Sequence, residues 1–273
     1  MSIEQTDTLK ESVRAHWEAE TCGTRGVEGG DRRAFFEQIE RERYEWEPYI
    51  KTFARFERGR GQRLLEVGVG AGTDFTNWAR NGAVATGVDL TERGVELTRE
   101  RLALEGLSAE VLRADAEALP FESNTFDIVY SYGVLHHSPH TVRAIGEVYR
   151  VLKPGGTALI MVYHLRSWTT LMLWGLHGLA KGQPWKSPRR AVYENLESPG
   201  TKVYTVDEAR VLFGDISSAR VWTQLAFGDL LKFRLSDKYQ SPLHRAMFKL
   251  YPRPLVEALG DRFGTCLMVE AVK

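Results

Sequence analysis

The stretch RLLEVGVGAGTD, residues 63–74, determines the fold that we expect for this chain. It starts with an apolar run typical of a strand, continues with three glycines at alternate positions, and leads at Asp74 into a segment that can form a helix. Glycine has no Cβ atom, so it adopts positive φ angles at low cost and lets a ligand lie against the backbone at a helix N-terminus. The pattern predicts a strand, a tight turn and the start of a helix, with a ligand at the turn.

A second strand with an acidic end follows in the sequence. Residues 84–89, VATGVD, have the composition of a strand and end at Asp89. In a βαβ nucleotide site, an acidic side chain about 20 residues after the glycines binds the hydroxyls of a ribose. We therefore expect the ligand to contain a ribose.

The residues around the glycines distinguish three ligand classes. A P-loop needs Lys and then Ser or Thr directly after its last glycine, whereas Thr73 and Asp74 follow Gly72 here, which argues against a triphosphate. A dinucleotide fingerprint needs a third glycine at the position of Thr73. The carboxylate of Glu66 would repel a pyrophosphate but attract a cationic group. A glycine-rich turn without a ligand is the simplest alternative, because a glycine pattern alone is weak evidence.

The Glu-x-Gly-x-Gly-x-Gly pattern that begins at Glu66 resembles the first motif of the class I S-adenosylmethionine-dependent methyltransferases. Three further segments resemble this family in the right order: an adenine-binding segment at 113–121, a fourth-strand segment at 126–137 and the turn before the fifth strand at 151–156. Over residues 63–163 the chain looks most similar to the type 11 subgroup, which includes quinone-biosynthesis and many natural-product methyltransferases. The resemblance implies a fold and a cofactor, but no particular substrate.

Strand and helix patterns alternate from Arg63 onward, which is typical of a parallel sheet with helices on both faces. We expect an α/β, doubly wound, Rossmann-like sheet of seven strands, the last of which is antiparallel in the family that the chain resembles. The expected strands are 63–67, 84–89, 109–113, 126–130, 157–163, 218–227 and 264–272, with a turn at 153–156. The expected helices are 8–20, 31–56, 73–81, 91–106, 141–151 and 205–213, with Thr91 and Thr205 as N-caps.

The chain is expected to divide into three parts. Residues 1–62 form an N-terminal helical cap segment, residues 63–163 the cofactor-binding core, and residues 164–273 the rest of the sheet with insertions at about 164–200 and 228–260. The first insertion is rich in Trp and Leu, so we expect it to cap a substrate with apolar parts. Packing between helices and a homodimer contact are comparable interpretations of this apolar insertion. The second insertion carries Tyr239, His244, Met247, Phe248 and Tyr251.

The resemblance implies S-adenosylmethionine as the cofactor and S-adenosylhomocysteine as the product. In such a site the glycines let the backbone approach the methionine and ribose portions, and the carboxylates bind the amino-acid end, the ribose hydroxyls and the adenine amino group. Leu90 would cover one adenine face, the amide of Ala116 would bind a ring nitrogen, and Ser131 would line the methyl channel. The expected cofactor-binding residues are Glu66, Gly68, Gly70, Gly72, Asp89, Leu90, Asp115, Ala116 and Ser131.

Methyl transfer from a sulfonium is an in-line displacement, for which an enzyme mainly supplies proximity, alignment and exclusion of water. A general base helps when the acceptor is a hydroxyl or an acidic carbon; His136 and His137 are the catalytic candidates, with a structural role as the alternative. The expected substrate-binding residues are Tyr44, Tyr132, Tyr163 and His164. No metal site is expected, because the seven histidines do not lie at metal-ligand spacing with carboxylates or cysteines.

Composition and charge exclude several other classes of protein. The formal net charge is zero, which argues against a general nucleic-acid binder. Cys22 and Cys266 form neither a disulfide framework nor a metal spacing, so we expect a reducing cytoplasm. The N-terminus lacks the pattern of a secretory signal, and the apolar stretch 168–180 is shorter than the ~20 residues that span a bilayer, so we expect no stable membrane insertion.

These observations favour a cytoplasmic methyltransferase that acts on a small molecule or short peptide at an O, N or C atom. One alternative is an enzyme that uses the same cofactor for intramolecular alkylation and releases methylthioadenosine. Another is a non-catalytic binding protein on the same fold, against which the intact glycine loop and the carboxylates argue. A nicotinamide-dependent reductase is a weaker alternative, because the glycine spacing does not fit a dinucleotide.

Overall fold

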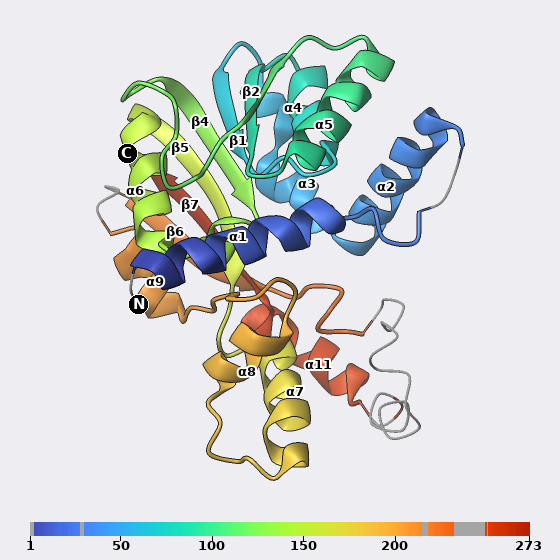
Figure 1. Cartoon of the computed structure of the whole chain (residues 1–273), viewed down its shortest axis with the longest axis vertical. Coiled ribbons are helices and arrows are strands. Elements are labelled where there is room, and N and C mark those ends of the chain that lie inside the picture. Colours follow the sequence, from blue (N-terminus) through green and yellow to red (C-terminus); the bar gives the residue numbers. More distant parts are fainter. Residues whose placement is uncertain (1–2, 28–29, 215–217, 232–248, 250) are drawn as a thin grey trace.

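A seven-stranded sheet forms the centre of this computed structural model, which describes residues 3–27, 30–214, 218–231, 249 and 251–273. The strands lie in the order β3-β2-β1-β4-β5-β7-β6 (Figure 1). Strands β1 to β5 are parallel, and β7 lies antiparallel between β5 and β6. The expected α/β sheet with an antiparallel last strand is thereby confirmed. The strands are β1 Arg63–Val67, β2 Val84–Asp89, β3 Glu110–Arg113, β4 Phe126–Tyr132, β5 Leu152–Tyr163, β6 Ser218–Gln224 and β7 Cys266–Val272.

Helices cover both faces of this sheet, because the side chains of its central strands point alternately to either side. Leu64 is buried in a core shared with α3, α4 and α5, whereas its neighbour Leu65 is buried in a second core with α6 and α9. Thr91 and Thr205 cap α5 and α9 as expected, and Thr205 forms a full capping box with Glu208. The covering helices are α3 Tyr49–Ala54, α4 Thr73–Arg80, α5 Glu92–Glu105, α6 Thr141–Val151 and α9 Val206–Leu212.

The parallel register brings the carboxyl ends of the central strands to one edge of the sheet. Val67 pairs with Val88, Asp89 pairs with Arg113, and Glu66 pairs with both Gly87 and Tyr130. The segments that follow β1, β2, β3 and β4 therefore all emerge at this edge, where open α/β sheets bind their ligands.

The expected N-terminal helix is longer than predicted, and the expected second helix is interrupted. Helix α1 spans Ile3–Ala19, whereas residues 31–56 form α2 (Arg32–Trp46) and the separate α3, followed by a 3₁₀ turn at Phe56–Gly59. The prediction of one helix over 31–56 was wrong because of Pro48. A residue before proline avoids the helical region, and Glu47 accordingly has φ −129° and ψ 60°.

A smaller lobe lies on the far side of α1 from the central strands. Figure 1 shows α1 (dark blue) crossing the carboxyl end of the sheet, with α7 (Trp168–His177), α8 (Pro188–Asn195) and α11 (Arg253–Leu259) beyond it. Helices α7 and α8 share a small core of Leu173, Val192 and Val203. The predicted first insertion is therefore a helical unit placed at the ligand-binding edge of the sheet.

Strand β5 begins earlier than expected, because the segment predicted as a turn at 153–156 lies inside it. The pairing with β4 jumps from Phe126 with Leu152 to Ile128 with Thr157, so the extra residues form a bulge. Gly155 has φ +78° and donates its amide to the Lys273 carbonyl. The proline and glycines thus interrupt the register of the strand without ending it.

Part of the second predicted insertion lies outside the described residues, including Tyr239, His244, Met247 and Phe248. Short 3₁₀ segments at Leu135–His137, Leu179–Lys181 and Gly260–Phe263 complete the described elements. Among the helices that the structure describes, none combines the length and apolarity needed to span a lipid bilayer.

Asp229 joins the lobe to the last strand through a buried hydrogen-bond network. Its carboxylate accepts bonds from the hydroxyls of Thr169 (3.1 Å) and Thr265 (2.6 Å), and from the amides of Ala226 (2.9 Å) and Thr265 (2.7 Å). Asp229 is fully buried. Removal of this carboxylate would leave several buried donors without an acceptor, which costs more than the bonds themselves contribute.

We expect Asp229→Ala to lower the free energy of unfolding by about 3 kcal/mol, as for other buried charged hydrogen-bond partners. Urea denaturation measures the change. Asp207→Ala is the matched control, since its exposed carboxylate pairs with Arg210 of the same helix, and it should change stability by less than about 0.5 kcal/mol. Equal stability of the two variants would show that the network is not structurally important.

Candidate functional site

The three glycines of the turn after β1 differ in what surrounds them. A Cβ atom on Gly68 would lie 2.2 Å from the Cγ2 of Val134, and one on Gly72 would lie 2.9 Å from the Oγ1 of Thr98. These two glycines are therefore required by packing. A Cβ on Gly70 would have a single described atom within 4 Å, the Cγ2 of Thr21 at 3.8 Å. Gly70, with φ +53°, thus presents bare backbone to space that a ligand can use.

Asp89, at the end of β2, lies directly beside this turn. One carboxylate oxygen accepts the amide of Gly70 at 2.9 Å, and the other accepts the amide and hydroxyl of Thr91 at 2.9 and 2.7 Å. These bonds orient the carboxylate and hold the turn against the strand end. Leu90 and Ala116, the two residues expected around the adenine, are partly buried at the same edge.

Glu66 is the one predicted cofactor-binding residue with an unsatisfied buried side-chain atom in the described structure. Its side chain is 3% exposed, and its Oε2 has no hydrogen-bond partner within the described part of the chain. Burial, with the nearby charge of Asp74, raises the pKa of Glu66 well above its ordinary value. A buried carboxyl beside a glycine turn suits an ammonium group, which would satisfy that oxygen and favour ionisation. The residues present therefore fit the amino-acid end of S-adenosylmethionine.

Asp74, at the start of α4, is held by three side chains. It accepts bonds from Arg43 (2.9 Å), Tyr44 (3.0 Å) and Tyr130 (2.8 Å). Burial alone would raise the pKa of Asp74, but the Arg43 charge and these bonds lower it below its ordinary value. Tyr44, expected at the substrate pocket, is instead buried against Phe56, and its hydroxyl is committed to Asp74. Its contacts are those of a core residue.

Helix α1 is fastened across the predicted adenine segment. The ammonium of Lys10 lies 2.7 Å from Asp115 and 2.7 Å from Glu117. At the other end of α1, the carboxylate of Glu18 accepts the amides of Glu92 and Arg93 at the N-terminus of α5. The sequence analysis missed Lys10 and Glu18, because charged residues on an amphipathic helix carry no signal of their partners.

Ser131 and Tyr132, at the end of β4, make local bonds. The Ser131 hydroxyl donates to the Val67 carbonyl at 2.9 Å and so links β4 to β1. The Tyr132 hydroxyl donates to Glu47 at 3.0 Å. Burial raises the pKa of Glu47, and the same carboxylate also accepts the hydroxyl of Tyr49 at 2.8 Å. Tyr132 is therefore fixed in orientation beside the expected methyl channel.

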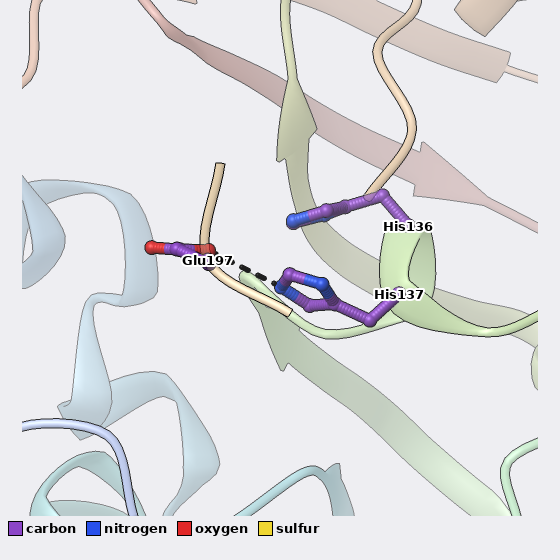
Figure 2. Close-up of side chains that lie close together, drawn as sticks. All are labelled: His136, His137 and Glu197. Atoms are coloured by element: carbon purple, nitrogen blue, oxygen red, sulfur yellow. Dashed lines mark ion pairs between the residues drawn. The ribbon is translucent and has the colours of Figure 1, made fainter. Parts of the chain in front are cut away.

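Figure 2 shows the two catalytic candidates, His136 and His137, projecting from their 3₁₀ turn toward Glu197 of the lobe. Both imidazoles are buried, and their ring centroids lie 4.2 Å apart. Tyr163, at the end of β5, lies 4.1 Å from the His136 ring and donates its hydroxyl to Glu197 at 2.9 Å. The ring of Trp17 from α1 contacts His137 at 5.2 Å. Four elements thus meet around the two histidines.

The two imidazoles differ in their hydrogen bonds. The Nδ1 of His137 lies 2.8 Å from the Ser198 hydroxyl and 3.1 Å from that of Thr201, and its Nε2 lies 3.4 Å from Glu197. Neither ring nitrogen of His136 has a hydrogen-bond partner among the residues described. Burial, followed by the charges of His137 and Lys202, lowers the pKa of His136 well below its ordinary value, which keeps this imidazole neutral.

His164 lies apart from this cluster, although the sequence analysis placed it in the substrate pocket. It is buried, its Nδ1 lies 3.1 Å from the Gly264 carbonyl, and its backbone forms a bridge with Tyr204. These contacts are structural. Glu197 takes its place near the histidines, and no spacing in the sequence indicates this, because Glu197 belongs to a segment 60 positions beyond His137.

Residues 65–160 match a family model described as a methyltransferase domain. The chain is 44% identical over 98 residues to the phthiotriol/phenolphthiotriol dimycocerosates methyltransferase of Mycobacterium leprae, a match that covers 35% of this chain and 36% of that protein. It is 36% identical over 121 residues to the ubiquinone/menaquinone biosynthesis C-methyltransferase UbiE of Neisseria meningitidis, which covers 43% of this chain and 49% of that protein. The matches thus span about a third to a half of these curated relatives.

Among solved structures, the complex between the Haloferax volcanii Trm112 methyltransferase activator and the putative methyltransferase contains a chain with a TM-score of 0.59. The match covers 96% of this chain and 97% of that one, at 18% identity, so it concerns the fold alone. The family-model match spans the glycine turn and the acidic strand ends. Over this segment the chain is similar to a methyltransferase domain and to known methyltransferases.

Proposed function

We propose that this protein transfers a methyl group from S-adenosylmethionine to an oxygen, nitrogen or acidic carbon of a small molecule or short peptide with apolar parts. The observation that carries the proposal is the combination of bare backbone at Gly70 with the unsatisfied Oε2 of Glu66 and the oriented carboxylate of Asp89. Around this one turn, the cationic amino-acid end of the cofactor and its ribose would each find a binding partner.

The residues of the chain would divide the work of binding as follows. Glu66 binds the ammonium of the cofactor, and the turn at Gly70 lies against the part of the cofactor that faces the backbone. Asp89 accepts hydrogen bonds from the ribose hydroxyls. The Asp115 carboxylate accepts a hydrogen bond from the adenine amino group after Lys10 of α1 has moved away from this carboxylate. S-adenosylmethionine supplies a methyl group already activated by its sulfonium, so the protein mainly aligns the acceptor and excludes water.

His136 and His137 are the groups best placed to accept a proton from an acceptor. His136 is neutral and buried with both nitrogens unpaired within the described structure, and His137 turns its Nε2 toward Glu197. Tyr132 and Tyr163 lie at the ends of β4 and β5 and would flank the acceptor. An acceptor carbon is within the scope of the family, since the Neisseria relative is a C-methyltransferase.

The lobe supports an acceptor with apolar parts. Its helix α7 has a high proportion of Trp and Leu and stands at the carboxyl edge of the sheet, beyond α1 (Figure 1). The partly exposed Leu171 and the largely exposed Trp185 belong to the same unit. Apolar side chains at the mouth of a site favour apolar ligands because they release ordered water on contact.

We expect Asp89→Ala to weaken the binding of S-adenosylmethionine by about 2 kcal/mol, because charged hydrogen bonds contribute about 1.5 to 3 kcal/mol. Isothermal titration calorimetry measures the affinity, and circular dichroism checks that the variant is folded. Asp127→Ala is the control, because Asp127 lies at the opposite end of the central strands and bonds Lys153 and the Arg63 amide. Unchanged affinity of a folded Asp89→Ala protein would remove Asp89 from the site.

The affinity for S-adenosylmethionine should rise with pH over about pH 5 to 7, where the α-amino group of the ligand stays charged. The pKa of Glu66 is raised in the free protein, so at low pH this carboxyl is protonated and must release a proton to pair with the ammonium. The affinity therefore levels off once the pH exceeds this pKa. Calorimetry at several pH values should show the slope in the native protein and a much smaller one in Glu66→Gln. Equal slopes would contradict the role of Glu66.

Product analysis tests the reaction itself. We expect turnover with an accepted substrate to yield S-adenosylhomocysteine, detected by mass spectrometry. Release of methylthioadenosine would instead indicate alkylation by the aminobutyl portion of the cofactor. Thermal shift assays provide the control for ligand class, since S-adenosylmethionine and S-adenosylhomocysteine should stabilise the protein and nicotinamide dinucleotides should not.

A further inference from the structure

We propose that His136, His137 and Glu197 bind a divalent transition metal ion, such as Zn²⁺ or Fe²⁺, at the acceptor end of the site. One ligand atom from each residue lies within 4.8 Å of the other two, and Figure 2 shows both imidazoles directed toward the carboxylate. The chain brings these groups together from two distant segments. Two histidines and one carboxylate form a donor set that first-row transition metals favour over Mg²⁺ or Ca²⁺.

The first support is the state of His136. Its side chain is fully buried, and both ring nitrogens lack a hydrogen-bond partner in the portion of the chain that is described. Buried polar atoms are almost always paired, because an unpaired one loses its bonds to water without replacement. A metal ion would take the lone pair of one nitrogen and so supply the partner that the protein does not.

The second support is the way in which His137 is held. The Nδ1 of His137 lies 2.8 Å from the Ser198 hydroxyl and 3.1 Å from the Thr201 hydroxyl, and the hydrogen of Thr201 is directed to the carbonyls of Leu196 and Ser198. Metal binding through Nε2 requires the tautomer in which Nδ1–H donates to these two hydroxyl oxygens, both of which can accept. In this tautomer the Nε2 lone pair faces the Glu197 carboxylate at 3.4 Å. Two acceptors that face each other attract a cation between them. Proteins orient a metal-binding histidine by bonding its other ring N–H to an acceptor, commonly a carboxylate, a backbone carbonyl or water, and hydroxyl oxygens take that place here.

The third support is the constraint on Glu197. Its backbone has φ +52°, in the left-handed region that residues other than glycine rarely adopt, and such conformations concentrate at functional sites. The hydroxyl of Tyr163 lies 2.9 and 3.0 Å from the two carboxylate oxygens. The Tyr163 hydroxyl thereby holds the carboxylate beside the histidines, although the Glu197 side chain remains partly exposed.

The ligand atoms must approach one another to bind a metal. Zinc bonds to nitrogen and oxygen are about 2.0 to 2.2 Å long, so two ligand atoms at a tetrahedral angle lie about 3.4 Å apart. The three atoms here lie within 4.8 Å of one another, so the widest pair closes by at most about 1.4 Å on binding, and the Glu197 side chain, which is 36% exposed, can supply this movement. Three protein ligands leave a coordination position open, as in catalytic zinc sites.

The open position gives the ion a role that rests on the proposed function. An ion held by His136, His137 and Glu197 would lower the pKa of an acceptor hydroxyl bound at the open position. The hydroxyl proton would be released to solvent, and the oxygen would then bond to the methyl carbon as the carbon–sulfur bond breaks. The histidines then act as ligands, and a separate general base is not required.

The test is to titrate the metal-stripped full chain with Co²⁺, followed by visible absorption, and with Zn²⁺ by calorimetry. We expect one ion per chain and ligand-field bands of a four- or five-coordinate site. Glu197→Gln and His136→Gln should each weaken Zn²⁺ binding at least tenfold. Glu194→Gln is the matched control, since this carboxylate lies in the preceding helix and pairs with Lys186 and Arg190, and it should bind as the native protein does.

Absence of saturable binding in the native protein would overturn the proposal, as would equal affinity in the native protein and the folded Glu197→Gln variant. Titration with S-adenosylmethionine in the same preparations separates this proposal from the proposed function. A protein that binds Zn²⁺ through Glu197 but ignores S-adenosylmethionine supports the metal site and contradicts methyl transfer. The reverse result leaves methyl transfer standing and removes the metal.

Discussion

The parallel pairing of β1 with β2 on one side and β4 on the other is the constraint on which the site depends. Because the three strands run in the same direction and in close register, their carboxyl ends meet at one edge. The glycine turn, Asp89 and the histidine turn are distant in sequence and share no local structure. They lie together only because each directly follows one of these strands. Any shift of register would separate Glu66 from Asp89 and remove the amide of Gly70 from its carboxylate.

Charge is distributed unevenly around this edge. The acidic groups Glu66, Asp74, Asp89 and Asp115 all lie near it, and two cations from the N-terminal helices, Lys10 and Arg43, balance part of the charge. Arg43 is paired with Asp74 in the interior, whereas the Lys10–Asp115 pair is only partly buried and costs little to separate. Of these two pairs, the first supports the fold and the second covers a predicted binding residue. Helix α1 is held at the site by the ion pairs of Lys10.

Unsatisfied buried atoms occur at two places in this site. The Oε2 of Glu66 lies beside the glycine turn, and the nitrogens of His136 lie where the lobe meets the sheet. Both are costly in isolation, and both are positioned where a ligand would remove the cost. The pKa shifts agree with this view, since burial raises the pKa of the Glu66 carboxyl and lowers the pKa of the His136 imidazole, which disfavours the charged form of each. The same physical signal therefore marks the cofactor end and the acceptor end of the site.

The sequence by itself determined the sheet, the order of its elements and the cofactor class, because these depend on local patterns: apolar strands, glycines at alternate positions, and caps such as Thr91. It also located the ends of β1, β2 and the helix at 141–151 almost to the residue. The break at Pro48 is a local signal that the expectation of one helix over 31–56 did not use. Only the tertiary structure showed that the Tyr44 hydroxyl bonds Asp74, that His164 lies beside the Gly264 carbonyl, and that Lys10 covers Asp115. It alone brought Glu197 to the histidines. These facts depend on contacts between segments far apart in the chain, and such contacts leave no periodicity or spacing in the sequence.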